Sequence, residues 1–284
     1  MFNPTEVMIN YCVKRLTNGY RQAFGHQGSD YADLIGWVAH LALEAIAHSD
    51  APYHDIEHTI LVTLVGQEIM RGKQCLKGYV SPKDWVHYII SLLCHDIGYV
   101  KGVCQPDQVT QRLFATGKND KLVQLTAGAT DASLTPYHVD RGQQFVAEKF
   151  ANHPLIDITL LQHNIELTRF PAPNLDLYRD TCDYPGLTRA ADLIGQLSDP
   201  RYLQKLPTLF YEFAETGTNQ QLGYHHPDDL RAGYPNFYRN VVYPHIQTAL
   251  SYLEATQQGR QIVANLYANV VAAEQNHMGL SLAA

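Results

Sequence analysis

Apolar residues recur at helical spacing through most of the chain, and the alternation typical of strands is almost absent. Residues spaced in this way fall on one face of a helix, which can then pack against a core. Similar stripes lie within 34–46 and 60–69. The first stripe consists of Met8, Cys12, Leu16 and Tyr20. The pattern predicts an all-α protein.

Capping residues mark several of the expected helix boundaries. Ser81, Pro82 and Asp84 supply an N-cap, a proline for the first helical position and an acidic residue for the first turn. We expect this helix to stop near Gly98 and another to run from Thr135 to about residue 152. Further helices are predicted at roughly 155–166, 186–198, 200–215, 237–256 and 259–275.

Two segments are expected to lie outside long helices because glycine and proline interrupt the helical pattern. Residues 99–131 are interpreted as an insertion of loops and short helices. Residues 217–238 are interpreted as a long ordered loop, either with substrate contacts or as a surface excursion. Within it, His225 and His226 have ligand-like composition, but a helix beginning at Pro227 is the favoured interpretation.

Composition limits the class of protein. The chain has 284 residues, of which 45% are hydrophobic and 17% are charged, as in a globular protein with a sizeable core. It contains no repeat or long polar linker, so one domain over 1–284 is predicted. The formal net charge is −7 and there is no basic run, which argues against a nucleic-acid polymer as partner.

Cysteine usage and the lack of an apolar leader suggest a location. The five cysteines are widely spaced and form no C-x-x-C pair, so neither a disulfide framework nor a cysteine zinc site is expected. No uninterrupted apolar run approaches the ~20 residues that a membrane span requires. We therefore expect a cytoplasmic protein without a membrane partner. The last two helices are expected to pack the core or a homodimer interface.

Three short strings in apolar surroundings bear imidazoles and carboxylates. They lie at 53–58, 94–98 and 190–193. Burying such groups unpaired is costly, and a divalent metal ion offsets the cost because imidazole nitrogen and carboxylate oxygen are its usual ligands. The groups concerned are His54, His58, His95, Asp96 and Asp192. His54 and His58 are one helical turn apart, so they can both bind the metal or divide the roles of ligand and catalytic acid.

In order and spacing, these strings resemble the H…HD…D pattern of the HD superfamily of metal-dependent phosphohydrolases. The match covers about residues 50–200 and implies an HD-domain helical bundle with additional N- and C-terminal helices. The 53–58 string resembles the opening of class I cyclic nucleotide phosphodiesterases, with Asp55 where that family prefers asparagine. Residues 136–142 and 161–164 resemble two elements of the HD-GYP branch.

The resemblance implies a ligand set for one or two divalent ions, with Fe, Mn, Zn, Mg and Co all compatible. The first metal would be held by His58, His95, Asp96 and Asp192. Asp96, also a catalytic residue, would bridge to a second metal completed by His138 and His163. The chain departs from the HD-GYP branch at Asn164, Ile165, 169–171 and Tyr99, which counts against cyclic dinucleotide hydrolysis.

The implied activity is hydrolysis of a phosphoester by a metal-activated hydroxide. His54 would be the general acid that protonates the leaving oxygen, oriented by Asp192, Glu57 or another carboxylate. The implied substrate is a small phosphorylated molecule, a nucleotide or cyclic nucleotide. Lys101 and Arg141 lie three to five residues from a proposed ligand and are the predicted substrate-binding residues.

Two alternatives from other classes stay open at the level of sequence. A branch of the same helical scaffold uses these ligands in a mixed-valent di-iron oxygenase, and His138 with His163 is compatible with that chemistry. A non-catalytic module that senses nucleotides or metals is the other alternative. Intact His54 and a complete primary ligand set argue against it.

Overall fold

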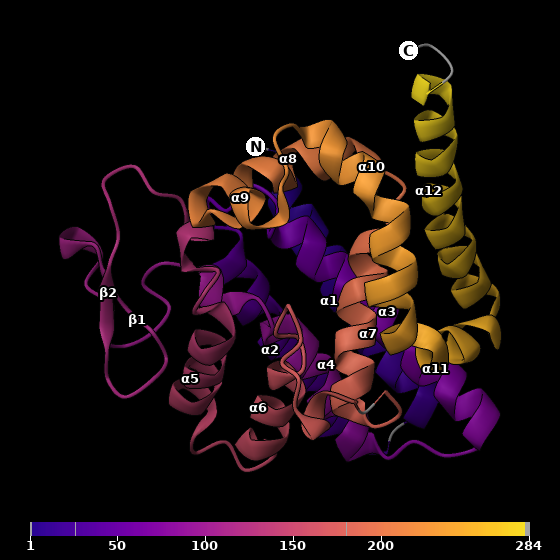
Figure 1. Cartoon of the computed structure of the whole chain (residues 1–284). Coiled ribbons are helices and arrows are strands. Elements are labelled where there is room, and N and C mark those ends of the chain that lie inside the picture. The colour runs from indigo at the N-terminus through magenta and orange to yellow at the C-terminus, as the bar shows by residue number, and fades with distance from the viewer. Residues whose placement is uncertain (1, 26, 180, 282–284) are drawn as a thin grey trace.

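The computed structural model, which describes residues 2–25, 27–179 and 181–281, confirms the all-α class (Figure 1). Helices α1 (Pro4–Phe24) and α2 (Ser29–Ile46) form an N-terminal pair that packs on the central helices. Cys12, Leu16 and Tyr20 of the first predicted stripe are fully buried. The apolar face of α1 therefore belongs to the core, as its spacing predicts.

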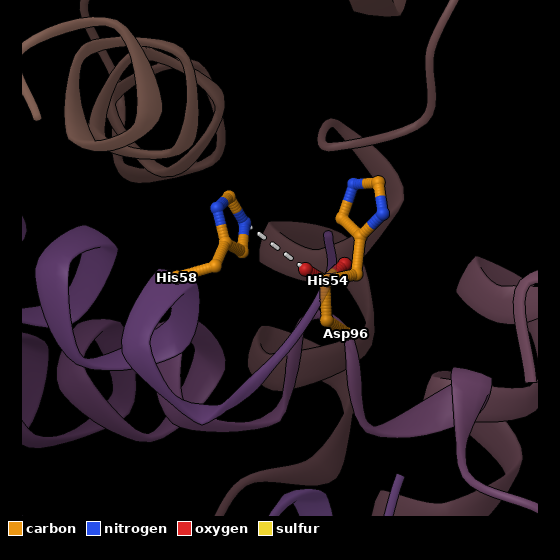
Figure 2. Close-up of side chains that lie close together, drawn as sticks. All are labelled: His54, His58 and Asp96. Atoms are coloured by element: carbon orange, nitrogen blue, oxygen red, sulfur yellow. Dashed lines mark ion pairs between the residues drawn. The ribbon is translucent and has the colours of Figure 1, made fainter. Parts of the chain in front are cut away.

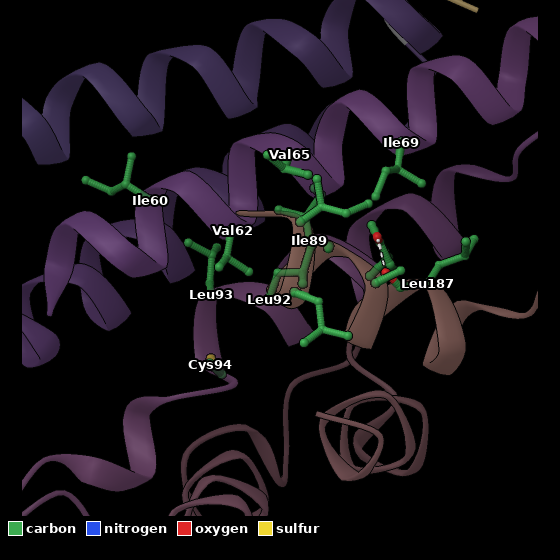
Figure 3. Close-up of a cluster of buried hydrophobic side chains, with 14 of the residues drawn as sticks. Ile60, Val62, Val65, Ile69, Ile89, Leu92, Leu93, Cys94 and Leu187 are labelled. Carbon is green, nitrogen blue, oxygen red and sulfur yellow. Dashed lines mark hydrogen bonds between the residues drawn. The ribbon is translucent and has the colours of Figure 1, made fainter. Parts of the chain in front are cut away.

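The centre of the molecule consists of α3 (Ile56–Lys77), α4 (Pro82–Cys94) and α7 (Tyr184–Leu197). Their apolar side chains interlock in a buried cluster (Figure 3). The α3–α7 contact is especially close, since a Cβ atom on Gly195 would lie 2.6 Å from the Val62 Cα. Burying these faces removes apolar surface from water, which is the main favourable term in folding.

The predicted capping of α4 is confirmed. The Ser81 side chain accepts a hydrogen bond from the Asp84 backbone N–H at 3.0 Å, with Pro82 in the first helical position. The helix ends at Cys94, and the short 3₁₀ helix η1 (Ile97–Tyr99) follows. His95 and Asp96 thus lie at the junction of the two helices, where consecutive side chains can approach one centre.

Two further helices cover one side of this centre. They are α5 (His138–Phe150) and α6 (Ile158–Glu166). The first turn of α5 packs on η1, and a Cβ atom on Gly98 would lie only 1.9 Å from the His138 carbonyl oxygen. Glycine is therefore required at position 98 by close backbone approach. This contact places His138 beside the end of the His95–Asp96 string.

The predicted insertion is a set of short elements that projects from α5 (Figure 1). It contains the 3₁₀ helices η2 (Val109–Gln111) and η3 (Asp131–Leu134) and a small antiparallel hairpin of β1 (Leu113–Ala115) and β2 (Leu122–Gln124). The hairpin was not predicted, whereas the loops and short helices were. Three-residue strands leave too little alternation to be recognised in sequence.

A buried ion pair holds this insertion against α5. The Arg141 side chain is fully buried, and its guanidinium donates to both carboxylate oxygens of Asp107 at 3.0 Å. It also donates to the carbonyl oxygens of Gly98, Val100 and Ala115 at 2.6–2.9 Å. A bidentate arginine–carboxylate pair with its remaining donors satisfied is a favourable way to bury both charges.

The C-terminal part contains α8 (Tyr202–Thr216), α9 (Thr218–Leu222) and α10 (Pro227–Phe237). A π-helical segment, η5 (Tyr238–Val242), leads to α11 (Tyr243–Glu254) and α12 (Gln257–Ser281). The predicted long loop at 217–238 is therefore wrong, because α9 and α10 occupy most of it. The favoured helix start at Pro227 is confirmed, with His226 and Asp229 forming a reciprocal capping box.

The remaining short element is the 3₁₀ helix η4 (Asp176–Arg179), in the connection from α6 to α7. One contiguous cluster of buried apolar side chains extends from Ile9 in α1 to Ala273 in α12. Among the helices in the described part of the chain, none has both the length and the hydropathy needed to cross a bilayer.

We expect Arg141→Met to lower the free energy of unfolding by about 3–5 kcal/mol, because the change leaves the buried Asp107 carboxylate without its cation. Lys118→Met is the matched control. Lys118 also pairs with a carboxylate, Asp140, but its side chain is 62% exposed, so a change of less than ~1 kcal/mol is expected. Urea denaturation measures both. Equal effects would show that the buried pair does not anchor the insertion.

Candidate metal centre

Four side chains from α3, the α4–η1 junction and α7 converge at the centre of the fold. Nε2 of His58 lies 3.1 Å from Oδ2 of Asp96 and 3.5 Å from Oδ1 of Asp192. Nε2 of His95 lies 3.1 Å and 3.7 Å from the same two oxygens. Two donors that are each roughly 2.0–2.2 Å from one ion lie about 3–3.6 Å apart, so the spacing fits a single ion.

Three atoms of this group are buried without a hydrogen-bond partner among the described residues. They are Nε2 of His58, Nε2 of His95 and Oδ2 of Asp96. The imidazole nitrogens approach Asp96 at ion-pair distance but without hydrogen-bond alignment. Leaving such atoms unsatisfied is costly, whereas a cation between them would satisfy all three. The donor set therefore fits a divalent metal ion.

The neighbouring imidazoles favour the ionised forms of the two carboxylates. Burial opposes ionisation, yet His95 and His58 hold the pKa of Asp96 well below its usual range. Burial is likewise outweighed at Asp192, where the adjacent His58 and His95 imidazoles lower the pKa to about 2. Burial alone would lower the pKa of His95, but Asp96 and Asp192 raise it well above its usual value. A divalent ion bound at this centre would compete with protons for the imidazoles.

Backbone contacts fix the orientation of two imidazoles near the centre. Nδ1 of His95 lies 2.7 Å from the Leu92 carbonyl oxygen, and Nδ1 of His138 lies 2.6 Å from that of Thr135. A carbonyl accepts a proton at Nδ1, which leaves the lone pair at Nε2. His95 is thereby held in the tautomer that binds a metal. His138 is held in the same tautomer beside the ring of Tyr99.

His54 lies next to the ligand cluster, in the turn that precedes α3 (Figure 2). One ligand atom of each of His54, His58 and Asp96 falls within a group whose members are all within 4.8 Å of one another. Nδ1 of His54 contacts Oε1 of Glu212. The other nitrogen, Nε2, is thus the one that Glu212 does not engage.

Glu212 of α8 is the carboxylate that orients His54. It is buried, and its Oε2 accepts hydrogen bonds from the backbone N–H groups of Tyr53 at 2.8 Å and His54 at 3.3 Å. Burial would lower the pKa of His54, but the Glu212 carboxylate offsets this and raises it to about 9. Of the carboxylates expected to orient this ring, neither Glu57 nor Asp192 does so. Glu57 pairs with Arg201 and Lys205 instead.

Sequence reasoning did not identify Glu212, which lies outside the 50–200 region. The only available signal was its place at an inward-facing position of the helix predicted at 200–215. A glutamate on an otherwise apolar face is a candidate for a buried partner of a histidine. Its target could not be chosen, because the pairing joins residues 158 positions apart.

The two predicted ligands of a second metal are placed differently from the first four. His163 is exposed on α6 and lines a separate hollow with His87 and Asp84. Its neighbour Asn164 instead points inward and donates to Ser91 at 3.1 Å. The prediction that His163 belongs to the centre is wrong, since its exposed side chain lines a hollow that none of the four clustered side chains lines. His138 lies near the cluster, but it is not part of a group of close ligand atoms.

The two predicted substrate-binding residues have structural partners. Arg141 is wrong as a substrate contact, because it is fully buried in the ion pair with Asp107. The Lys101 ammonium donates to the Ala129 carbonyl oxygen at 2.7 Å and pairs with Asp131 at 3.2 Å. Its ammonium thus holds the loop before η3 and the first residue of that helix, and a substrate contact by Lys101 stays a prediction.

The fold and this cluster define an α-helical protein with a buried His–Asp centre suited to a divalent ion. The chain belongs to the Npun_R2479-like family, whose model matches residues 2–276. No curated protein shows a significant match to the sequence. The family match includes α8 to α11 and most of α12, so the helix that contributes Glu212 lies within the matched region.

Asp96→Asn is expected to abolish retention of a divalent metal, because the amide removes the charge that faces both His58 and His95. His163→Asn is the matched control and should keep the metal content of the unchanged protein. Elemental analysis after dialysis against metal-free buffer measures both. Full metal content in Asp96→Asn would refute the assignment of the centre.

Metal affinity should weaken as the pH falls, because His58 and His95 bind a metal only when their Nε2 atoms are unprotonated. Their pKa values are raised by the adjacent carboxylates, so protons compete with the ion through neutral pH. Each displaced proton changes the affinity by about tenfold per pH unit. Competition titrations with Mn²⁺ or Zn²⁺ between pH 6 and pH 8 test this. A pH-independent affinity would contradict it.

Proposed function

We propose that the protein is a metal-dependent phosphohydrolase that cleaves a phosphoester of a nucleotide or cyclic nucleotide. The observation that carries the proposal is a buried four-donor cluster with a separate, carboxylate-supported histidine beside it. A metal site alone accounts for the cluster. It does not account for His54, which is held by Glu212 with one ring nitrogen directed to the same place.

His58, His95, Asp96 and Asp192 would hold the ion. When bound there, a divalent ion would polarise a phosphoryl oxygen and lower the pKa of a water molecule used in the attack. The helices around the cluster exclude bulk water from these side chains, three of which are 0–5% exposed. Low water content strengthens electrostatic interactions within the site.

His54 would supply the proton that the leaving oxygen needs. The Glu212 carboxylate keeps the imidazole protonated at neutral pH and accepts from Nδ1, so the transferable proton is at Nε2. When Nε2 gives up this proton, Glu212 continues to hold the ring in the same orientation. General acid catalysis of this kind contributes roughly 10²–10⁴-fold to a rate.

The choice of a nucleotide rests on the resemblance of the 53–58 string to cyclic nucleotide phosphodiesterases. The oxygenase alternative depends on a second metal with His138 and His163 as ligands, and His163 lies outside the centre. Hydrolysis at a single metal site with an adjacent acid needs neither His138 nor His163 as a ligand. It is therefore the function that the arrangement favours.

A direct test starts from protein stripped with a chelator and reloaded separately with Mn²⁺, Mg²⁺, Zn²⁺, Co²⁺ or Fe²⁺. Each form is assayed anaerobically with bis(4-nitrophenyl) phosphate and a panel of linear and cyclic nucleotides. We expect hydrolysis with at least one metal and none with the stripped protein. Lack of turnover by every metal-loaded form would refute the proposed function.

Replacing His54 should separate metal binding from catalysis. We expect His54→Asn to keep the bound metal and to lower kcat by about 10²-fold or more on substrates with alkoxide leaving groups. The loss should be much smaller for a 4-nitrophenyl ester, whose leaving group departs readily as an anion. Loss of metal together with activity would identify His54 as a ligand instead of an acid.

Glu212→Gln should reproduce part of this effect, since the amide keeps the shape but removes the charge that supports the imidazolium. Glu215→Gln is the matched control on the same helix. Glu215 binds Thr130 and Ser133 at the start of η3 and does not contact His54. We expect kcat to fall only in Glu212→Gln, as steady-state kinetics on an alkyl phosphodiester would show. Equal losses in both variants would mean that α8 acts only through its packing.

A further inference from the structure

Three aromatic rings form a column beside the metal centre. Tyr99 lies between His54 and His138, with ring centroids 4.6 Å from the first at an interplanar angle of 13° and 4.5 Å from the second at 20°. Tyr99 is 2% exposed and belongs to η1, where its backbone N–H donates to the Asp96 carbonyl oxygen at 3.0 Å. The column is thus attached directly to the metal-binding string.

The two ends of the column are held in different ways. At one end, Nδ1 of His138 bonds to the Thr135 carbonyl oxygen at 2.6 Å, and the α5 backbone at His138 packs tightly on Gly98. This ring is therefore a fixed support for Tyr99. At the other end, the His54 ring is held at Nδ1 by Glu212. One hydrogen bond fixes the position of one ring atom but lets the ring tilt about that bond.

Tyr99 removes this remaining freedom. Its ring stacks on the His54 ring, while the rings of Tyr53 and His58 are edge-to-face with the His54 ring at centroid distances of 5.2 Å and 5.3 Å. Stacked and edge-to-face rings have preferred geometries, so they restrict tilt as well as position. Glu212 at the edge and Tyr99 on the face together fix the orientation of the His54 ring, which offers one nitrogen within 4.8 Å of ligand atoms of His58 and Asp96.

We infer that Tyr99 is a positioning residue for His54, supported from behind by His138. Tyr99 acts through the imidazole and does not touch the phosphoester. His138 packs against Tyr99 and supports it, and is not a metal ligand. This inference rests on the proposed function, in which His54 donates a proton to the leaving group. The inference gives a role to Tyr99, the residue that directly follows the 94–98 string.

The test compares Tyr99→Leu, which removes the flat ring, with Tyr99→Phe, which keeps it. With an alkyl phosphodiester we expect Tyr99→Leu to lower kcat about 10- to 100-fold, because small displacements of a catalytic group have effects of this size. KM and metal content should change less than about twofold, since neither depends on proton donation. Tyr99→Phe should retain nearly the full kcat. Tyr99→Met provides a second ring-free variant if the leucine variant does not fold.

Leaving-group dependence distinguishes positioning from general damage. The loss in Tyr99→Leu should nearly disappear with bis(4-nitrophenyl) phosphate, which needs little protonation. An equal loss on both substrates, or full activity on both, would overturn the inference. A structural defect would lower both rates together and reduce metal content.

A measurement without turnover keeps this inference separate from the proposed function. In Zn²⁺-loaded protein with isotope-labelled histidine, the ring of Tyr99 should shift the His54 ring-proton resonances upfield, with His54→Asn used for assignment. The shift should persist in Tyr99→Phe and vanish in Tyr99→Leu. Unchanged resonances in Tyr99→Leu would refute the stack itself. Metal-loaded wild-type protein that shows the shift but hydrolyses no substrate would instead refute the hydrolase function, and with it the catalytic use of the stack.

Discussion

The burial of two carboxylates against two imidazoles is the interaction on which the rest of this structure depends. Asp96 and Asp192 would be too costly to enclose among apolar helices without nearby positive charge. His58 and His95 meet them at 3.1–3.7 Å, and the unsatisfied atoms of the group all face one another. The close contact between α3 and α7 and the junction after α4 bring these four groups together. A cation at their centre is the simplest compensation.

The histidine beside the centre depends on a different part of the chain. His54 precedes α3, but its partner Glu212 comes from α8, and its stacking partner Tyr99 comes from η1. Three segments far apart in sequence thus hold one imidazole ring. A group held at its edge and on its face loses little orientation during a reaction, which is the advantage of a preorganised site. The C-terminal helices are therefore part of the candidate site as well as of the core.

Positive charge near the centre is largely committed to structural pairs. Arg141 is enclosed with Asp107, Lys101 pairs with Asp131, and Lys205 pairs with Glu57 at 3.0 Å. A substrate phosphate would thus rely mainly on the metal for charge neutralisation. The enclosure of Arg141 shows that a basic residue close to a motif in sequence can be held in a structural pair. The same partner that satisfies Arg141 inside the fold makes it unavailable at the centre.

The sequence by itself determined the helical class, most helix boundaries and the residues of the cluster, because apolar periodicity, caps and short ligand strings are local signals. The helices within 217–238 were missed because glycine and proline there also occur at helix ends. Tertiary structure alone decided that His163 points away, that Arg141 is enclosed and that Glu212 reaches His54. Each of these depends on the rotation and packing of helices distant in sequence, which a local pattern does not contain. The sequence thus names the groups of the centre, and the fold decides which of them meet.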